Sequence, residues 1–149
     1  MKKTINLDGM TCIPDNFMKR WEGESIAFIN AEEVTAIGDG FLGECQFLKS
    51  LDLAPLTNVT TIGHGFLVRC RRSLASLDLA PLTNVTTIGD YFLEGCSKLT
   101  SLDLTPLANV TTIGHGFLWW CDNLESENIT WPDTEFWDKQ RRLYEKNHS

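Results

Sequence analysis

Apolar and polar positions recur along the chain with a period of 24 to 26 residues. Five isoleucines mark the period, and each is followed four residues later by a phenylalanine. These pairs are Ile13 and Phe17, Ile37 and Phe41, Ile62 and Phe66, Ile88 and Phe92, and Ile113 and Phe117. A period in the twenties is typical of a solenoid, in which each unit buries its apolar side against its neighbours. The pattern therefore predicts about five stacked coils.

Each predicted coil contains a short strand, two turns and a short helical turn. The strand is indicated by apolar residues on both sides of a polar one, as in Leu51, Asp52 and Leu53. Proline at a strand exit fits this scheme, because proline cannot donate a ladder hydrogen bond. A second extended piece ends at the isoleucine, and the phenylalanine lies in the helical turn. The glycines after the isoleucines are expected to supply backbone angles that a side chain would obstruct. They are Gly38, Gly63, Gly89 and Gly114.

The two ends of the chain depart from the repeat and predict caps. Residues 1–23 are interpreted as an N-terminal cap with a first partial repeat, residues 24–126 as the repeats, and residues 127–149 as a C-terminal strand and capping helix. The repeat is expected to stop at Glu127, which stands where other coils have the strand leucine. An amphipathic helix is predicted from Asp133 to Lys146. It is expected to cover Trp119, Trp120 and Trp131, and the alternative is a helix that binds a partner. With 149 residues, the chain is expected to form one domain.

The clearest copy of the repeat, residues 88–104, reads IGDYFLEGCSKLTSLDL. Its spacing of isoleucine, phenylalanine, cysteine and leucines resembles the BspA-like branch of the leucine-rich repeats, and the resemblance extends from about residue 10 to 125. It implies an α/β leucine-rich-repeat solenoid of about five coils, with short parallel strands, short helical turns on the opposite side and a C-terminal capping helix. It also implies a non-enzymatic surface for protein binding, often in cell-surface, adhesion or effector proteins of microbes.

Charge and motif content narrow the function classes. The net charge of −7 argues against a nucleic-acid partner, which requires a basic stripe, and favours basic partners. The sequence contains no phosphate-binding loop, hydrolase elbow or zinc signature, so no catalytic residue, metal or cofactor is predicted.

A polar column on the predicted strands is the leading candidate for a binding surface. The aspartates between the inward leucines point to the opposite face of the sheet, which leucine-rich repeats usually make concave, and serines line the same face. The predicted partner-binding residues are Ser50, Asp52, Ser76, Asp78, Ser101 and Asp103. Either these side chains extend into water and the aspartates accept hydrogen bonds from the serines, or they attract a basic peptide or a cation.

A second polar column follows the isoleucines and contains Asp39, His64, Asp90 and His115. Alternation of aspartate and histidine would favour protonated histidine, because a neighbouring carboxylate stabilises its charge. The column fits either simple surface pairing or a pH-sensitive edge.

Two further features concern cysteine and arginine. Cys45, Cys70, Cys96 and Cys121 occupy one column and are expected to point inward as small apolar side chains. The third coil has one additional residue and contains Arg69, Arg71 and Arg72, the basic spot of an acidic chain. This spot is either a specific contact or a solvated loop.

The chain has no apolar run long enough for an export signal or a membrane span, which predicts a cytoplasmic protein without membrane insertion. The alternative is a cell-surface or secreted protein exported by an unrecognised route. The predicted function is a non-enzymatic protein interaction module that binds a partner through its acidic, concave sheet face. The alternative is a self-associating structural or adhesion repeat protein, and the expected state is a monomer or a weak self-associate.

Overall fold

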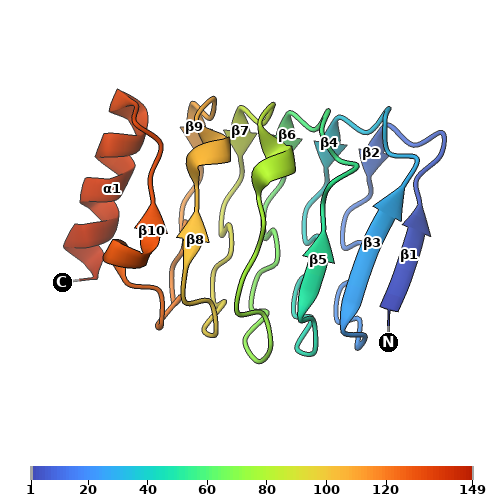
Figure 1. Ribbon diagram of the computed structural model, residues 1–149, viewed down its shortest axis with the longest axis horizontal. Helices are drawn as coiled ribbons and strands as arrows, with labels where there is room; N and C mark the ends of the chain where they lie inside the picture. The colour runs from blue at the N-terminus through green and yellow to red at the C-terminus, as the bar shows by residue number, and fades with distance from the viewer. Residues whose placement is uncertain (1, 149) are drawn as a thin grey trace.

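The computed structural model describes residues 2–148 as a stack of coils whose strands all pair in parallel (Figure 1). One row of strands contains β2 (Cys12–Ile13), β4 (Ala36–Ile37), β6 (Thr61–Ile62), β7 (Thr87–Ile88) and β9 (Thr112–Ile113). The other contains β1 (Lys2–Asn6), β3 (Ser25–Ile29) and β5 (Ser50–Asp52), followed by the pair β8 (Leu102–Asp103) and β10 (Ile129–Thr130). The 3-10 helices η1 (Ala80–Leu82), η2 (Thr105–Leu107) and η3 (Ser126–Asn128) precede the helix α1 (Glu135–Asn147).

The predicted columns are confirmed by the strand register. Ile37 pairs with Ile13 on one side and with Ile62 on the other, so equivalent residues of successive coils lie side by side. Inside the stack, the phenylalanine rings form a ladder in which neighbouring centroids are 5.2 Å apart between Phe66 and Phe92 and the planes differ by 7°. The core is therefore continuous along the stack, and the prediction of a parallel solenoid of about five coils is confirmed.

The turn that carries phenylalanine and cysteine differs from the expected helical turn. Alternate residues have left-handed backbone angles, with φ of 51° at Leu42 and 57° at Glu44. Amides of this turn consequently pair with the coils on both sides: Leu42 N–H donates to the Phe17 carbonyl of the preceding coil, and Glu44 N–H donates to the Val68 carbonyl of the next. Within the turn, Gly43 N–H still donates to the Gly40 carbonyl at 3.0 Å, so backbone groups of the turn are satisfied partly inside it and partly by the neighbouring coils.

The glycines after the isoleucines are required for a different reason from the one predicted. At Gly63, φ lies outside the left-handed region, but an added Cβ would lie 2.8 Å from the carbonyl carbon of Gly38. The left-handed glycine of this coil is Gly65, with φ of 72°. Other coils place Asn16 and Tyr91 at that position, with φ of 59° and 62°. Close approach of the coils, rather than backbone angle, therefore explains the glycine that follows each isoleucine.

The cysteine column points inward, as predicted. The four side chains are at most 1 % exposed, and all five cysteines of the chain are free thiols within the described residues. Each buried thiol donates to a carbonyl of the preceding coil, as Cys96 does to Leu67 at 3.2 Å between Sγ and O. Burial raises the pKa of Cys45 to about 11 and the pKa values of Cys70 and Cys121 to about 12. Burial also raises the pKa of Cys96 well above its ordinary value.

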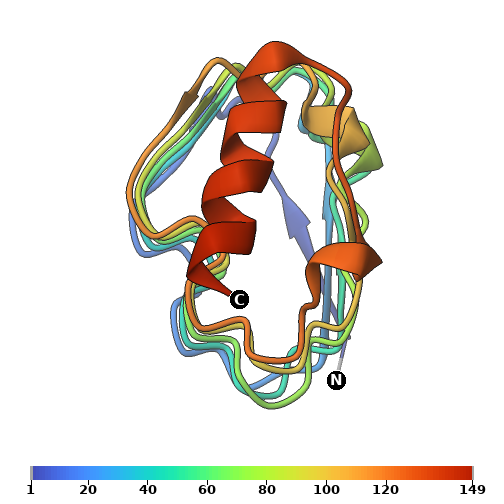
Figure 2. The same cartoon turned by 90° about the vertical axis from the view of Figure 1, so that its left-hand side faces the viewer.

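The helix α1 covers the C-terminal end of the stack (Figure 2). Thr134 caps its start, because its hydroxyl accepts the N–H of Trp137 at 3.2 Å. The indole of Trp137 is fully buried and donates from Nε1 to the carbonyl of Leu107 at 2.8 Å. Tyr144, further along the same helix, packs its ring 5.8 Å from that of Trp131. The prediction of a capping helix at this end is confirmed, with its start two residues later than expected.

Two details of the C-terminal end were predicted wrongly. The repeat does not stop at Glu127, because η3 shifts the chain by two residues and Ile129 then pairs with Leu102 in place of the strand leucine. The helix also leaves Trp119 and Trp120 open, with exposed fractions of 45 % and 65 %. The terminal residues of the two predicted caps, Met1 and Ser149, lie outside the described residues.

We expect Gly63→Ala to destabilise the protein by about 1–3 kcal/mol, because the new Cβ would overlap the backbone of the preceding coil. The matched control is Gly65→Asn, which should cost less than about 1 kcal/mol because Asn16 occupies the equivalent position. Urea unfolding measures both effects. Equal losses for the two variants would contradict the close-approach explanation.

The buried thiols should make stability fall at alkaline pH. Their folded pKa values exceed the ordinary value of 9.0, so above pH 9 the unfolded chain loses protons that the folded chain keeps. The stability that the buried thiols contribute is therefore fully present below about pH 9 and is lost as the pH rises towards 11–12. The free energy of unfolding falls by up to about 1.4 kcal/mol per pH unit for each thiol. Urea unfolding at pH 8 to 10.5 measures this slope.

The control for the thiol effect compares two core truncations. Cys96→Ala removes one of the titrating groups and should make the pH slope shallower by one thiol. Leu99→Ala removes a buried apolar side chain of the same coil, so it should lower stability without a change in slope. Identical slopes for Cys96→Ala and the wild type would show that this thiol does not contribute.

Candidate functional site

The structure exposes all the predicted partner-binding residues but interrupts the sheet that carries them. Ser50 and Asp52 lie on β5, and Asp103 lies on β8. Ser76 and Asp78 belong to an extended segment outside the strands. In this third coil the strand leucine follows Cys70 by seven residues where neighbouring coils have six, and the additional residue takes the coil out of the ladder. Figure 1 shows this coil between β5 and β8, without a strand of its own in that row.

Each aspartate of this face is held by the turn that follows it. The Oδ1 atom of Asp52 accepts the backbone N–H of Ala54, and that of Asp78 accepts the N–H of Ala80, both at 2.9 Å. Asp103 makes the same bond with Thr105. These are Asx turns, which fix the start of the proline turn. The expected bonds from the serines to the aspartates are therefore replaced by bonds from backbone amides.

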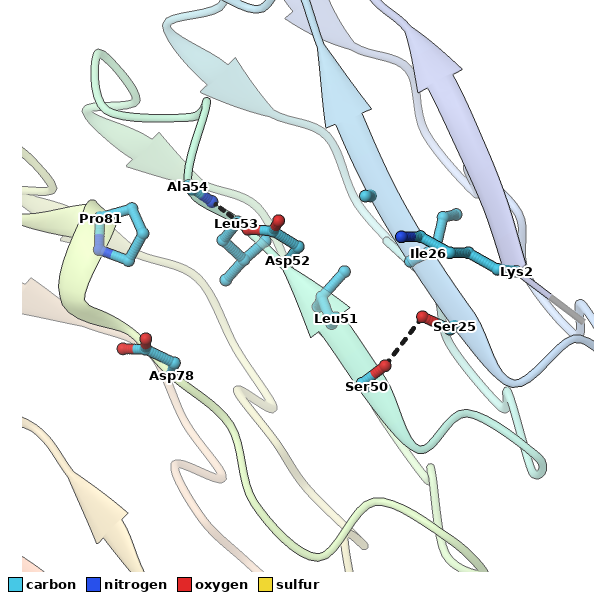
Figure 3. A pocket seen from close by; sticks show the side chains of 11 residues that line it. Lys2, Ser25, Ile26, Ser50, Leu51, Asp52, Leu53, Ala54, Asp78 and Pro81 are labelled. Carbon is cyan, nitrogen blue, oxygen red and sulfur yellow. Dashed lines mark hydrogen bonds between the residues drawn. The ribbon is translucent and has the colours of Figure 1, made fainter.

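An open hollow of about 390 Å³ lies on this face, between the first and third coils (Figure 3). Its polar lining includes Lys2, Ser25, Ser50, Asp52 and Asp78, while Asp103 lies beyond it. Ser50 donates its hydroxyl to that of Ser25 at 2.8 Å between the oxygens. The hollow thus places one ammonium group at one side and two carboxylates at the other, a distribution that can orient a polar or charged segment of a ligand.

The second column forms a ladder of hydrogen bonds between coils. Oδ1 of Asp39 accepts the backbone N–H of His64 at 2.8 Å, and Oδ1 of Asp90 accepts that of His115 at 2.8 Å. In the coil between them, Nδ1 of His64 accepts the N–H of Asp90 at 2.7 Å. His64 therefore acts as an acceptor in the place of a carboxylate, which requires an unprotonated Nδ1. The same Nδ1 lies 3.6 Å from Oδ2 of Asp90, and the expectation of protonated histidine in this column stays a prediction.

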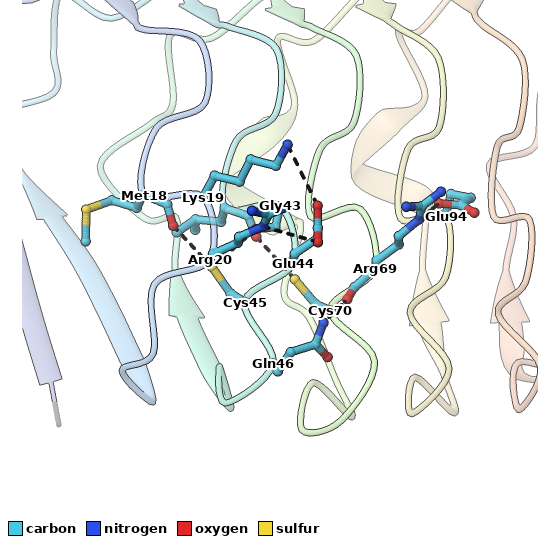
Figure 4. A network of polar contacts seen from close by, with 11 residues as sticks. Met18, Lys19, Arg20, Gly43, Glu44, Cys45, Gln46, Arg69, Cys70 and Glu94 are labelled. Atoms are coloured by element: carbon cyan, nitrogen blue, oxygen red, sulfur yellow. Dashed lines mark hydrogen bonds and ion pairs between the residues drawn. The ribbon is translucent and has the colours of Figure 1, made fainter.

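The turns on the far side of the coils carry ion pairs from one coil to the next (Figure 4). Arg20 Nε lies 3.4 Å from Glu44 Oε2, and Arg69 Nε lies 3.5 Å from Glu94 Oε2. The Glu94 side chain is largely buried, so its arginine partner offsets the cost of desolvation. The predicted basic spot is thus divided: Arg69 takes part in this pairing, whereas the side chain of Arg71 is exposed.

The residue that precedes the buried cysteine is glutamate, arginine or glycine in the earlier coils and tryptophan in the last coil. Trp119 and Trp120 occupy the positions of Val68 and Arg69 two coils earlier. Both indoles are exposed, and they line an open hollow of about 460 Å³ together with Asp122, Asn147 and His148. The C-terminal helix was expected to cover both indoles. The signal that this expectation missed is the replacement of charged residues by two adjacent tryptophans in a single coil.

The asparagines of the repeated Asn-x-Thr sequences also connect the coils. Nδ2 of Asn58 donates to the Glu32 carbonyl at 2.8 Å, and Nδ2 of Asn84 donates to the Thr57 carbonyl at 2.7 Å. A glycan on Nδ2 would disturb these bonds, so the repeated asparagines have a structural role between coils.

Two kinds of feature are absent from the described part of the chain. Residues 2–148 contain no group of three or more His, Cys, Asp or Glu side chains placed to hold a metal ion. Among the same residues, no helix has the length and apolar character needed to cross a membrane.

Comparison with known proteins gives a family match. The model of the BspA type leucine rich repeat region matches residues 11–139 in six copies. No curated protein and no solved structure matches the chain. Since the family match spans most of the sequence and agrees with the parallel solenoid, the chain belongs to the BspA-type leucine-rich repeat family.

Proposed function

We propose that the protein is a non-enzymatic binding module that holds another protein on its sheet face. Membership of a leucine-rich repeat family supports an interaction or scaffold role. The observation that carries the proposal is the hollow that unites Ser50, Asp52 and Asp78 on an exposed face. Ser76, Ser101 and Asp103 extend the same polar surface along the stack.

The Asx turns make this face suitable for binding. Because Oδ1 of each aspartate is already held by a backbone N–H, the carboxylate loses less conformational freedom when a partner arrives. The second oxygen of each carboxylate can accept a charge-assisted hydrogen bond from lysine or arginine. A basic segment is therefore the partner chemistry that fits Asp52 and Asp78 best.

The position of Lys2 adds a direction to this proposal. Lys2 lines the same hollow at the side of β1, away from Asp78 (Figure 3). A bound segment would place its basic side chains towards Asp52 and Asp78 and keep them away from Lys2, where like charges repel. The net charge of −7 would also favour encounter with a basic partner at low salt.

The test is affinity capture from host lysate with the wild type beside Asp52→Asn/Asp78→Asn/Asp103→Asn, followed by mass spectrometry. Asparagine retains the Oδ1 acceptor of the Asx turn, so the triple variant should fold normally while three charges are removed. We expect a partner that binds the wild type, dissociates as salt is raised, and binds the triple variant at least tenfold more weakly.

The matched control removes three carboxylates elsewhere, as in Glu32→Gln/Glu33→Gln/Asp133→Asn, where all three side chains are exposed. This variant has the same net charge as the first and should capture the same proteins as the wild type. If the sheet-face variant also captured the same proteins with unchanged salt dependence, the acidic face would be excluded as the binding surface.

A further inference from the structure

We propose that the protein forms a two-fold symmetric dimer through the tryptophan-bearing side of its last three coils, with the two stacks antiparallel. We call this region the Trp120 surface. Its residues, which together line a hollow of about 320 Å³, are Arg69, Arg71, Glu94, Gly95, Ser97, Trp120 and Asp122. The surface belongs to the turns and not to β3, β5 or β8, so such a dimer leaves the sheet face open.

The charges of this surface are complementary to themselves. Arg71, Ser97 and Asp122 each follow the buried cysteine of their coil, so they form one column. Successive coils are about 4.8 Å apart, which puts Arg71 and Asp122 roughly 10 Å apart on either side of Ser97. Both side chains are exposed, and within residues 2–148 neither makes an ion pair. The column therefore has a cation at one end and an anion at the other.

A two-fold axis that lies in the plane of this surface and crosses the stack at Ser97 exchanges the third coil with the fifth. Arg71 of each copy then faces Asp122 of the other, which gives two ion pairs. The parallel arrangement would instead place Arg71 on Arg71 and Asp122 on Asp122, and like charges in contact are unfavourable. Charge thus selects the antiparallel orientation.

The neighbouring column fits the same symmetry. Arg69, Gly95 and Trp120 each precede the buried cysteine, so the axis places Trp120 of one copy opposite Arg69 of the other. A guanidinium over an indole face gives a cation–π contact. Gly95 lies between them and has no side chain, and the stem of Arg69 lies against it, since a Cβ at Gly95 would be 3.1 Å from Arg69 Cγ. The exposed indole of Trp120 can therefore lean into the hollow of the other copy.

Apolar contact completes the match. Trp119, which is 45 % exposed, occupies the column of Val68, so the axis brings Trp119 of one copy onto Val68 of the other. The ring of Tyr91 meets Trp119 edge-on, with centroids 6.5 Å apart, and holds the indole at the surface. Tryptophan, tyrosine and arginine are the residues most enriched at protein interfaces. Charged, aromatic and apolar residues of this surface thus meet complementary residues of the second copy, while Glu94, near the axis, is already paired with Arg69 of its own copy. A second copy therefore fits this site better than an unrelated protein.

Sedimentation velocity of the full chain at low salt tests the proposal. The wild type, a chain of 16.8 kDa, should change from monomer to dimer as its concentration rises through the micromolar range expected for a small interface. Arg71→Asp and Asp122→Arg should each weaken the dimer at least tenfold, because each variant opposes like charges. An equimolar mixture of the two variants should restore association, since the carboxylates at positions 71 and 122 of the first chain then meet the guanidinium groups at positions 122 and 71 of the second.

The double variant Arg71→Asp/Asp122→Arg keeps the wild-type net charge of −7 and should also dimerise. Arg142→Asp, on an exposed face of α1, matches the charge change of Arg71→Asp and should leave the dimer intact. Circular dichroism verifies that each variant is folded. A wild type that stays monomeric at all concentrations overturns the proposal. The proposal is also overturned if the Trp120 surface binds another protein but not a second copy of this chain. Single variants that dimerise normally, or a mixture that stays monomeric, would overturn the antiparallel pairing.

Discussion

Hydrogen bonding between successive coils is the interaction on which the rest of this structure depends. The strands are two to five residues long, and a coil has no second layer of its own to cover its apolar side. Backbone groups are satisfied by the coil before and the coil after, as Gly63 N–H shows by its bond to the Ile37 carbonyl. The stability of each coil therefore depends mainly on its contacts with the coil before it and the coil after it, as in other linear repeat proteins.

This dependence explains why side chains in very different environments obey the same period. The buried thiols, the exposed Asp39 and the asparagine Asn58 all make their hydrogen bonds to a neighbouring coil. It also makes the two ends special. At the C-terminal end, α1 covers the last coil. At the other end, Lys3 lies in register with the inward-facing Ile26, so a charge stands in a core column of the edge strand. An inward charge on an edge opposes the addition of another strand.

The sequence period predicts that residues one repeat apart are equivalent, and this was correct for the inward cysteines and for the parallel strands that end at the isoleucines. It does not specify the backbone between equivalent residues. The left-handed backbone angles at Leu42 and Glu44 cannot be recognised from the hydrophobic pattern. The glycine at position 63 was expected to supply an unusual backbone angle, whereas it is required because two coils come close together there. The acceptor role of His64 was missed for the same reason, since its donor is a backbone amide 26 residues away. At the end of the repeat, equivalence failed because η3 shifts the register to Ile129.

Comparison of the coils also helps to distinguish residues that stabilise the stack from residues that have another role. A residue that recurs in every coil has an explanation in stacking or in a turn, and even the aspartates of the sheet face serve the Asx turns with one of their oxygens. A side chain that occurs in a single coil has no such explanation. Trp119 and Trp120 interrupt columns that elsewhere carry inter-coil ion pairs, and they remain exposed beside a helix that could have covered them. Adjacent exposed aromatic side chains are typical of surfaces that bind another molecule, and stacking of the coils alone does not account for these two residues.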